Sequence, residues 1–342
     1  EIDEWTHYLY DATNNAVAHD TVIGPPRHLQ WVGGPRYSRQ HDHMSGASAM
    51  VSANGRLFHI FDYASPFSIQ LPSDWRLAAR DAFNGKTLWQ RDIDEWHTQM
   101  FRLKSGPAQL TRRLVAIDDR VYVTLGLEAP VSCLDAATGQ TLQVYEGTAK
   151  TEEMIYSDGV LFLLINDHPF RQPKQPSELI YDFAEGERRI VALDAQSGDV
   201  LWNVTQPSVL PITLTADEEH VLFCGDERVF CLDRKNGKQV WQSEQVQRRK
   251  SIPTFFGLTL VAYEDVVLFS GGSTDRDPKN ATGGDNTMYA LDAKTGRTLW
   301  THDHPASGYK SAEDILVIDG LAWITENTFG NQSGVCIGLD PK

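Results

Sequence analysis

The amino-acid sequence predicts an all-β fold, a β-propeller of four-stranded antiparallel blades, and two observations carry that prediction. A ten-residue pattern recurs five times without gaps, its aspartates 39 to 59 residues apart. Strand-like runs precede the copies. Internal repeats at such spacing are typical of solenoids and propellers. We expect about six blades in this chain and seven or eight in the intact protein.

The repeated pattern describes a hairpin followed by a large aromatic side chain. Each copy has Asp, then Gly four residues later, and four of the five copies have Trp four residues beyond that. The Gly supplies a positive φ in a tight turn after the first strand, and the Trp of the second strand can fill the gap between neighbouring sheets. The copies are RDAFNGKTLW (80–89), LDAATGQTLQ (134–143), LDAQSGDVLW (193–202), LDRKNGKQVW (232–241) and LDAKTGRTLW (291–300).

Two further strands are expected upstream of each hairpin. Runs such as LVAIDDRVYVTL (114–125) and LTLVAYEDVVLFSG (258–271) have alternating halves around a polar turn. Four strands per repeat make the blade of a propeller. We therefore expect a lead-in over 1–27 and a propeller over 28–342, with blades at about 43–93, 112–147, 152–205, 212–244, 256–303 and 313–342, the last incomplete.

The repeat resembles that of the pyrroloquinoline-quinone-type propellers, whose docking motif is Ala-x-Asp-x-x-x-Gly-x-x-x-Trp. The resemblance covers roughly Gln30 to Lys342, and EWTHYLYDATNNAVA (4–18) is similar to the lead-in of quinoprotein dehydrogenases. The family includes those dehydrogenases, a cofactor-free outer-membrane assembly subunit, and exported proteins of planctomycete-like bacteria. The resemblance implies that HLQWVGGP (28–35) is an outer strand that completes the last blade and closes the ring. Because the sixth blade lacks its outer strand, we expect one or two more blades after Lys342, from the same or a separate chain.

Composition excludes two classes of function. Lys and Arg number 31 against 46 Asp and Glu, a formal charge of −15, which argues against a general nucleic-acid binder. No apolar run approaches the ~18 residues of a membrane helix. The chain begins at Glu1 without Met, so we expect a periplasmic or secreted protein whose export signal has been removed. Cys133 and Cys231 occupy the same place in two copies and are interpreted as small buried filler.

Long insertions are expected on one face of the propeller. They cover 62–75, 90–110, 166–188, 271–285 and 326–334, all outside the short hairpin turns. Binding and catalysis concentrate on long loops held by a rigid scaffold.

Candidate site residues cluster in segments assigned to that face. His41 and His43 point the same way in an extended chain and could share a divalent metal such as zinc or calcium. Asp275 and Asp277 lie in an acidic Gly-rich loop that could hold calcium. The other candidates are cations, acids and one aromatic near the channel mouth, expected to bind an anionic or saccharide ligand: Lys104, Arg112, Arg113, Lys310, Glu152, Glu153, His168 and Trp96.

Three functions follow. The first is an exported carbohydrate-active enzyme of lyase or hydrolase type, in which Lys104 or Arg113 neutralises a uronate carboxylate and His41 or His43 abstracts the α-proton. The second is a quinone-dependent dehydrogenase, which the resemblance implies. The sequence, however, lacks the vicinal cysteine pair of the family's enzymes and a recognisable set of calcium ligands. Pyrroloquinoline quinone is therefore the less expected cofactor. The third is a cofactor-free scaffold that binds proteins.

Overall fold

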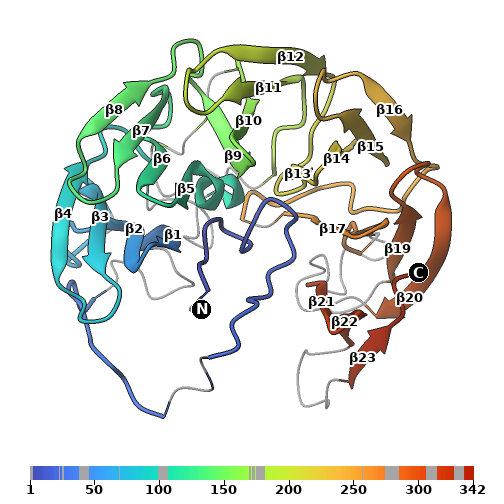
Figure 1. The fold of residues 1–342 in the computed structure, drawn as a ribbon, viewed down its shortest axis with the longest axis horizontal. Coiled ribbons are helices and arrows are strands. Elements are labelled where there is room, and N and C mark those ends of the chain that lie inside the picture. Colours follow the sequence, from blue (N-terminus) through green and yellow to red (C-terminus); the bar gives the residue numbers. More distant parts are fainter. Residues whose placement is uncertain are drawn as a thin grey trace. The chain divides into compact units, whose positions relative to one another are not determined.

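The computed structural model describes residues 3–22, 24, 27–37, 46–68, 70–98, 107–168, 171, 174, 182–255, 257–273, 285–305, 314–326 and 335–342 (Figure 1). Within these ranges the strands form six antiparallel sheets, five of four strands and one of three. Each sheet is a blade and is numbered in chain order. Among the described residues, no helix is long and apolar enough to cross a lipid bilayer.

The strands of each blade follow one another in the sequence. Blade 1 has β1 (Ala47–Ala53), β2 (Arg56–Asp62), β3 (Trp75–Asp81) and β4 (Thr87–Asp92), and blade 2, which follows the 3₁₀ helix η2 (Ala108–Arg113), has β5 (Leu114–Ile117), β6 (Arg120–Thr124), β7 (Val131–Asp135) and β8 (Thr141–Val144). Blade 3 has β9 (Thr151–Ser157), β10 (Val160–Ile165), β11 (Arg188–Asp194) and β12 (Val200–Gln206), and blade 4 has β13 (Thr215–Ala216), β14 (His220–Gly225), β15 (Arg228–Asp233) and β16 (Gln239–Gln242). Blade 5 has β17 (Thr259–Tyr263), β18 (Val266–Ser270), β19 (Asp285–Asp292) and β20 (Thr298–Pro305), and blade 6 has β21 (Leu316–Ile318), β22 (Leu321–Glu326) and β23 (Val335–Leu339).

The chain divides into two compact units. Unit 1 comprises Glu1–Asp11, Ala18–Tyr156 and Phe162–Tyr181, and unit 2 comprises Ala12–Val17, Ser157–Leu161 and Asp182–Lys342. In unit 1, Phe58 and Ile60 of blade 1 belong to one buried cluster with Val121 and Val123 of blade 2. In unit 2, blades 4 and 5 share a cluster of the same kind. Each core is therefore the apolar space between neighbouring sheets.

The hairpin between the third and fourth strand explains the Asp and Gly of the repeat. In blade 1 the Asp81 carboxylate accepts the backbone N–H groups of Phe83 (2.9 Å) and Asn84 (3.0 Å). Gly85 has φ +73° and donates its N–H to the Asp81 carbonyl oxygen (2.9 Å). The loop spans five residues, 82–86. The Asp side chain satisfies backbone donors in this loop, and Gly has the positive φ that the sequence predicts.

A β-bulge in the same hairpin turns the repeat Trp toward the next blade. Ala79 pairs with Trp89 and Arg80 with Thr87, which leaves Leu88 unpaired. The corresponding shift occurs in blades 2 to 5. A bulge changes the face on which the following side chain lies. Here it leaves an apolar residue beside the Trp position exposed: Leu88, Leu142, Leu201, Val240 and Leu299.

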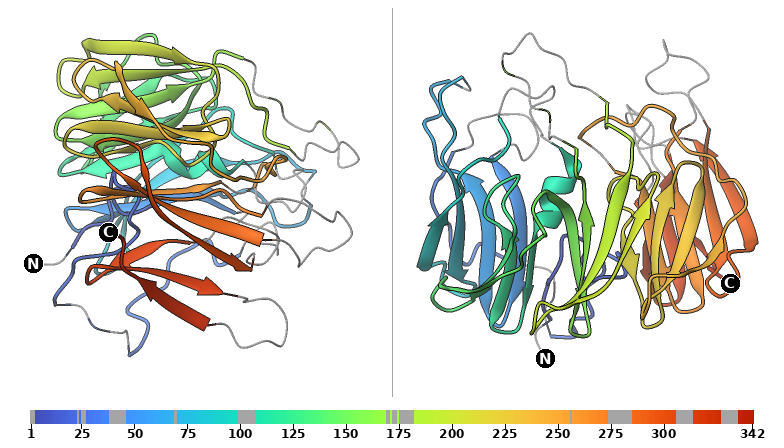
Figure 2. Two further views of the ribbon diagram at one scale, coloured as in Figure 1. Left: turned by 90° about the vertical axis from the view of Figure 1, so that its right-hand side faces the viewer. Right: turned by 90° about the horizontal axis from the view of Figure 1, so that it is seen from above.

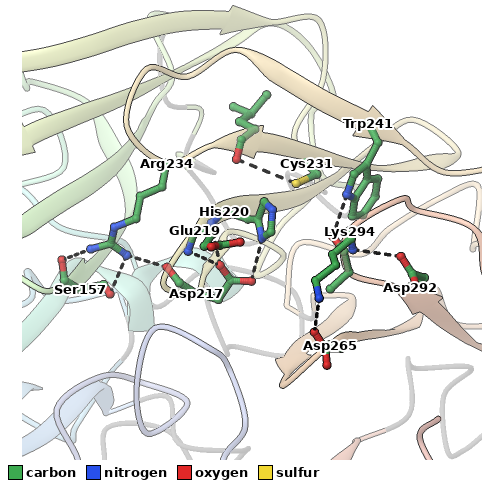
Figure 3. A network of polar contacts seen from close by, with 12 residues as sticks. Ser157, Asp217, Glu219, His220, Cys231, Arg234, Trp241, Asp265, Asp292 and Lys294 are labelled. Atoms are coloured by element: carbon green, nitrogen blue, oxygen red, sulfur yellow. Dashed lines mark hydrogen bonds and ion pairs between the residues drawn. The ribbon is translucent and has the colours of Figure 1, made fainter.

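The repeat Trp docks on the hairpin of the next blade. In unit 1, Trp89 donates its indole N–H to the Ala136 carbonyl oxygen (2.9 Å) and lies on Gly139. In unit 2, Trp241 (labelled in Figure 3) donates to the Ala293 carbonyl oxygen (2.8 Å). Its ring lies on Gly296. The indole ring covers the glycine so closely that a side chain there would overlap it.

Residues 28–35 form no strand, although Trp31 is docked like a repeat Trp. Its indole N–H donates to the Ala82 carbonyl oxygen (2.9 Å), and its ring lies on Gly85 of blade 1. A strand is defined by a hydrogen-bonded partner, and within the described residues the segment 28–35 pairs with none. Trp31 therefore makes the side-chain contacts expected of an outer-strand Trp, whereas the backbone of 28–35 has no strand partner within the described residues.

The N-terminal segment, residues 5–15, contacts the innermost strand of successive blades; we call it the N-terminal strap. In unit 1, Trp5 and Ser52 of β1 exchange hydrogen bonds, Trp5 N to Ser52 Oγ at 3.0 Å and Ser52 N to the Trp5 carbonyl oxygen at 2.7 Å. Ala116 N of β5 donates to the Thr6 carbonyl oxygen (3.0 Å), and Tyr156 N of β9 donates to His7 Nε2 (2.9 Å).

In unit 2 the strap continues in the same way. Ala216 N of β13 donates to the Ala12 carbonyl oxygen (2.8 Å), and Ala262 N of β17 donates to the Thr13 carbonyl oxygen (3.0 Å). The Asn15 side chain accepts from Val317 N (2.9 Å) and donates to the Val317 carbonyl oxygen (3.0 Å). Backbone groups at one end of the inner strands are thus paired with the strap.

The buried cysteines agree with their interpretation as filler. Cys133, Cys224 and Cys231 are buried free thiols. Cys224 pairs with Val229 and Cys231 with Leu222, so the two cysteines of this hairpin do not face each other. Burial raises the pKa of Cys231 to about 12, which disfavours the reactive thiolate.

Candidate functional site

The predicted site divides between residues that the structure describes and residues that it does not. His41, His43, Lys104, Asp275, Asp277 and Lys310 lie outside the described residues. Of the described candidates, His168 is exposed, whereas Trp96, Arg112, Arg113, Glu152 and Glu153 are buried in unit 1. Within the described part of the chain, no group of three or more His, Cys, Asp or Glu side chains could hold a metal ion.

Arg113 ends η2 and lies in the interior of unit 1. It is 2% exposed, donates to the Leu127 carbonyl oxygen (2.8 Å) and stacks over the Trp96 ring at 5.6 Å. Burial lowers the pKa of Arg113 to about 10, and the Glu152 carboxylate opposes that shift. Trp96 donates its indole N–H to Ser48 Oγ (2.9 Å). At 2% exposure, this guanidinium is closed to a substrate carboxylate as the structure stands.

Arg112 and Glu153 form a second buried pair of opposite charges. Arg112 is 1% exposed and Glu153 is fully buried. Burial lowers the pKa of Arg112, and the Glu153 carboxylate is the main charge that opposes the shift. The structure therefore brings together the two arginines and two glutamates that the sequence assigns to ligand binding. It gives each arginine a carboxylate from β9.

Asn166, which the sequence analysis did not single out, links two of these candidates. Its side-chain Nδ2 donates to Glu152 Oε1 (2.7 Å), and its side-chain Oδ1 accepts the backbone N–H of His168 (3.1 Å). Asn166 directly follows β10, where the long connection to β11 begins. A polar residue directly after a buried apolar strand is the signal that could have identified it.

His7 is a buried titratable group that the predicted site does not include. It is 2% exposed; its Nε2 accepts from Tyr156 N, so the ring proton lies on Nδ1 and is donated to Thr6 Oγ1 (2.7 Å). Thr6 in turn donates to the Tyr10 carbonyl oxygen (3.0 Å). Burial, and then the positive charge of Arg112, lower the pKa of His7 from 6.5 to about 3. Neutral His7 is therefore a structural part of the strap.

Acid should destabilise the protein through its buried histidines. Burial also lowers the pKa of His97 to about 4. Because the folded state binds fewer protons than the unfolded state, this stability is complete above pH ~6.5 and falls as the pH drops toward 4. Each of the two histidines contributes up to about 1.4 kcal/mol per pH unit in that window. Equilibrium urea denaturation at several pH values measures the slope.

The variant His7→Gln isolates one of these contributions. Glutamine can accept from Tyr156 N and donate to Thr6, but it does not titrate. We expect its free energy of unfolding to fall less steeply than that of the wild type between pH 6.5 and 4. Parallel profiles for the two proteins would show that His7 contributes nothing.

Blade 1 carries a pocket of about 520 Å³ on the flank away from blade 2. We call this face the blade-1 flank; its main side chains are Trp31, Met50, Leu57, His59, Phe61 and Arg80. Met50 is 52% exposed, although it lies in the middle of β1. Sequence alternation in β1 and β2 could have indicated this second apolar face.

Of the polar side chains on the blade-1 flank, His59 is neutral and Arg80 is hydrogen-bonded to backbone carbonyl groups. Burial and the nearby Arg80 charge lower the pKa of His59 to about 4. Arg80 donates to the carbonyl oxygens of Gly85 (2.9 Å) and Gly34 (2.5 Å). The flank therefore presents an apolar surface with a neutral imidazole.

Comparison with known proteins places the repeat in a family. A family model described as outer membrane protein assembly factor BamB matches residues 73–274 and 186–342. No match was found among curated proteins.

Solved structures share the fold at low sequence identity. The computationally designed Ika8 protein is 16% identical with a TM-score of 0.52, covering 84% of this chain and 70% of that one. Quinohemoprotein alcohol dehydrogenase from Comamonas testosteroni is 12% identical with a TM-score of 0.53, covering 94% of this chain and 57% of the dehydrogenase. BamB from Moraxella catarrhalis is 14% identical with a TM-score of 0.47, covering 81% and 68%. The predicted propeller of four-stranded antiparallel blades is confirmed, and at these identities the likeness concerns the fold alone.

Proposed function

Since the chain belongs to the PQQ-like β-propeller family of the assembly factor BamB, we propose that it is a non-catalytic scaffold of the cell envelope that binds other protein elements. The blade-1 flank is the observation that carries this proposal. The placement in the envelope rests on the family description, which concerns outer-membrane assembly.

The blade-1 flank differs from its counterpart in blade 2. Aligned on their first turns, Leu57 and His59 correspond to Val121 and Val123, and Met50 corresponds to Leu114. The three blade-2 residues are fully buried in the cluster shared with blade 1. In blade 1, by contrast, Met50 is 52% exposed and the flank holds a pocket. A hollow, apolar sheet face with exposed side chains such as Met50 is typical of a surface that another protein covers.

A β-sheet is the partner that this flank fits best. Sheets pack face to face through alternate side chains, and Trp31 already occupies the docking place that an outer-strand Trp of a preceding blade would take. The proposed occupant is a blade to which residues 28–35 contribute the outer strand. Its other strands would come from the remaining part of the propeller, in the same or a separate chain.

Peroxide oxidation of Met50 tests the proposed contact. Oxidation of methionine follows its exposure, so we expect Met50 to oxidise about tenfold more slowly in protein isolated from its natural source than in recombinant 1–342. Met154 and Met288 are fully buried and report any unfolding. Equal rates for Met50 in the two preparations would overturn the proposed partner.

Assays of turnover test the scaffold itself. Pyrroloquinoline quinone with calcium, followed by dye reduction, and acidic polysaccharides, followed by formation of unsaturated product, should give no activity. Activity abolished by His41→Ala with His43→Ala would establish the lyase hypothesis instead. That hypothesis has its histidines outside the described residues and Arg113 in the interior of unit 1.

A further inference from the structure

The connection between β2 and β3 projects an uncharged apolar tip from blade 1. We call its described residues, 63–68 and 70–73, the blade-1 finger; the sequence over this stretch, YASPFSIQLPS, contains no charged residue. Phe67 is 93% exposed and Leu71 is 45% exposed. Figure 2 shows this connection extending past the ends of the blade-1 strands (right, blue). Phe67 is the most exposed of the large hydrophobic side chains in the described part of the chain.

The base of the finger is tightly braced. Asp62 is fully buried, and its carboxylate accepts the backbone N–H groups of Ala64 (3.1 Å) and Asp74 (2.9 Å). Tyr63 N donates to the Asp74 carbonyl oxygen (2.8 Å), which closes the two ends of the connection. Arg76 binds Asp74 through two hydrogen bonds (2.9 and 2.7 Å) and lies over the Tyr63 ring at 5.4 Å. These contacts hold the two ends of the connection together.

Short turns also bind the described residues on either side of the tip. Phe67 N donates to Ser65 Oγ (3.3 Å), Gln70 N donates to Ser68 Oγ (3.2 Å), and Leu71 N donates to the Ser68 carbonyl oxygen (3.3 Å). An aromatic side chain held on such a loop loses little conformational entropy on binding. This is the usual character of a binding hot spot.

We propose that the blade-1 finger docks in a concave apolar pocket of a partner protein, with Phe67 as the inserted side chain. A projecting tip cannot enclose a small ligand, because small-molecule sites are concave. An anionic lipid surface attracts Lys and Arg, and the finger has neither. The proposal rests on the scaffold function and names the partner's surface.

Charges at the base of the finger define the rim of the partner's pocket. Asp92 is 85% exposed and Asp74 is 41% exposed, whereas Arg76, which pairs with both, is 35% exposed. Interfaces commonly surround an apolar centre with a polar rim of complementary charge. The partner's pocket should therefore carry at least one basic side chain at its edge.

Site-specific photocrosslinking in the producing organism identifies the partner. The test variant is Phe67→p-benzoylphenylalanine, and the matched control is the same replacement at Phe83, 54% exposed on the hairpin between β3 and β4. We expect an adduct with one protein from position 67 and none from position 83. That protein is then purified, and its affinity is measured for the wild type, Phe67→Ser and Phe83→Ser.

The proposal predicts that Phe67→Ser weakens binding by about tenfold or more, with an unchanged Tm, and that Phe83→Ser stays within twofold of the wild type. No adduct from position 67, equal adducts from both positions, or an unchanged affinity would overturn it. So would cosedimentation with vesicles of phosphatidylethanolamine and phosphatidylglycerol that Phe67→Ser abolishes, which would make the occupant a membrane. If turnover were found while the Phe67 contact held, the scaffold function would fail and the docking site would remain.

Discussion

Gly296→Ala is expected to destabilise unit 2 by roughly 3–5 kcal/mol. Gly296 has φ +70°, and a methyl group there would lie 2.3 Å from Cε3 of the Trp241 ring. The variant therefore combines backbone strain with an overlap against an indole that is itself fixed by its hydrogen bond to Ala293. Equilibrium urea denaturation measures the loss in free energy of unfolding.

Gly320→Ala is the matched control for this prediction. Gly320 has φ +78°, and nothing lies within 4 Å of a methyl group added there. It carries the backbone strain alone, worth about 1–2 kcal/mol. Equal losses in the two variants would show that the Trp–Gly contact adds nothing beyond backbone conformation.

Arg112→Met is expected to be the second severe change, with a loss of about 3–5 kcal/mol in unit 1. Removing the guanidinium takes away a positive charge that interacts with the fully buried Glu153 carboxylate. Burial without compensation is unfavourable for the ionised carboxylate. The pKa of Glu153 should rise in the variant, so the loss should be smaller at low pH.

Two further variants separate charge from packing. Arg112→Met with Glu153→Leu replaces both charges by apolar groups and should recover most of the loss, because a buried ion pair gives little net stability over an apolar pair. Arg56→Met breaks the pair with Asp119 at 3.0 Å, whose carboxylate side chain is 67% exposed, and should cost less than about 1 kcal/mol. A double variant as unstable as Arg112→Met would assign the effect to packing.

The repeated residues could be predicted from the sequence because their partners lie within the repeat. Asp81 and Gly85 satisfy one hairpin, and the recurrence of this spacing shows a constraint on the backbone. The length of the hairpin loop could not be predicted, since the Asp carboxylate replaces a backbone partner. The absence of a described strand at 28–35 has the same cause. Trp31 needs only the hairpin of blade 1 to dock, whereas a strand needs a second strand beside it.

The buried charges show what the sequence pattern cannot tell. Arg112 and Glu153 are far apart in the sequence, and each alone is typical of a solvent-exposed binding residue. Only the tertiary fold brings Arg112 of η2 within electrostatic range of Glu153 of β9 and buries both side chains. The blade-1 finger was predicted as one insertion among several, but the exposure of Phe67 depends on the hydrogen bonds of Asp62, whose role the sequence does not indicate.

The N-terminal strap has a consequence for biosynthesis. Its contacts follow the order of translation: Trp5 meets Ser52, His7 meets Tyr156, and Asn15 meets Val317, which is made 302 residues later. At ribosomal rates of about 5–20 residues per second, Asn15 waits roughly 15–60 s for its partner. The strap can therefore be bound step by step as each inner strand emerges from the ribosome, and the Asn15 contact forms only after Val317 has been made.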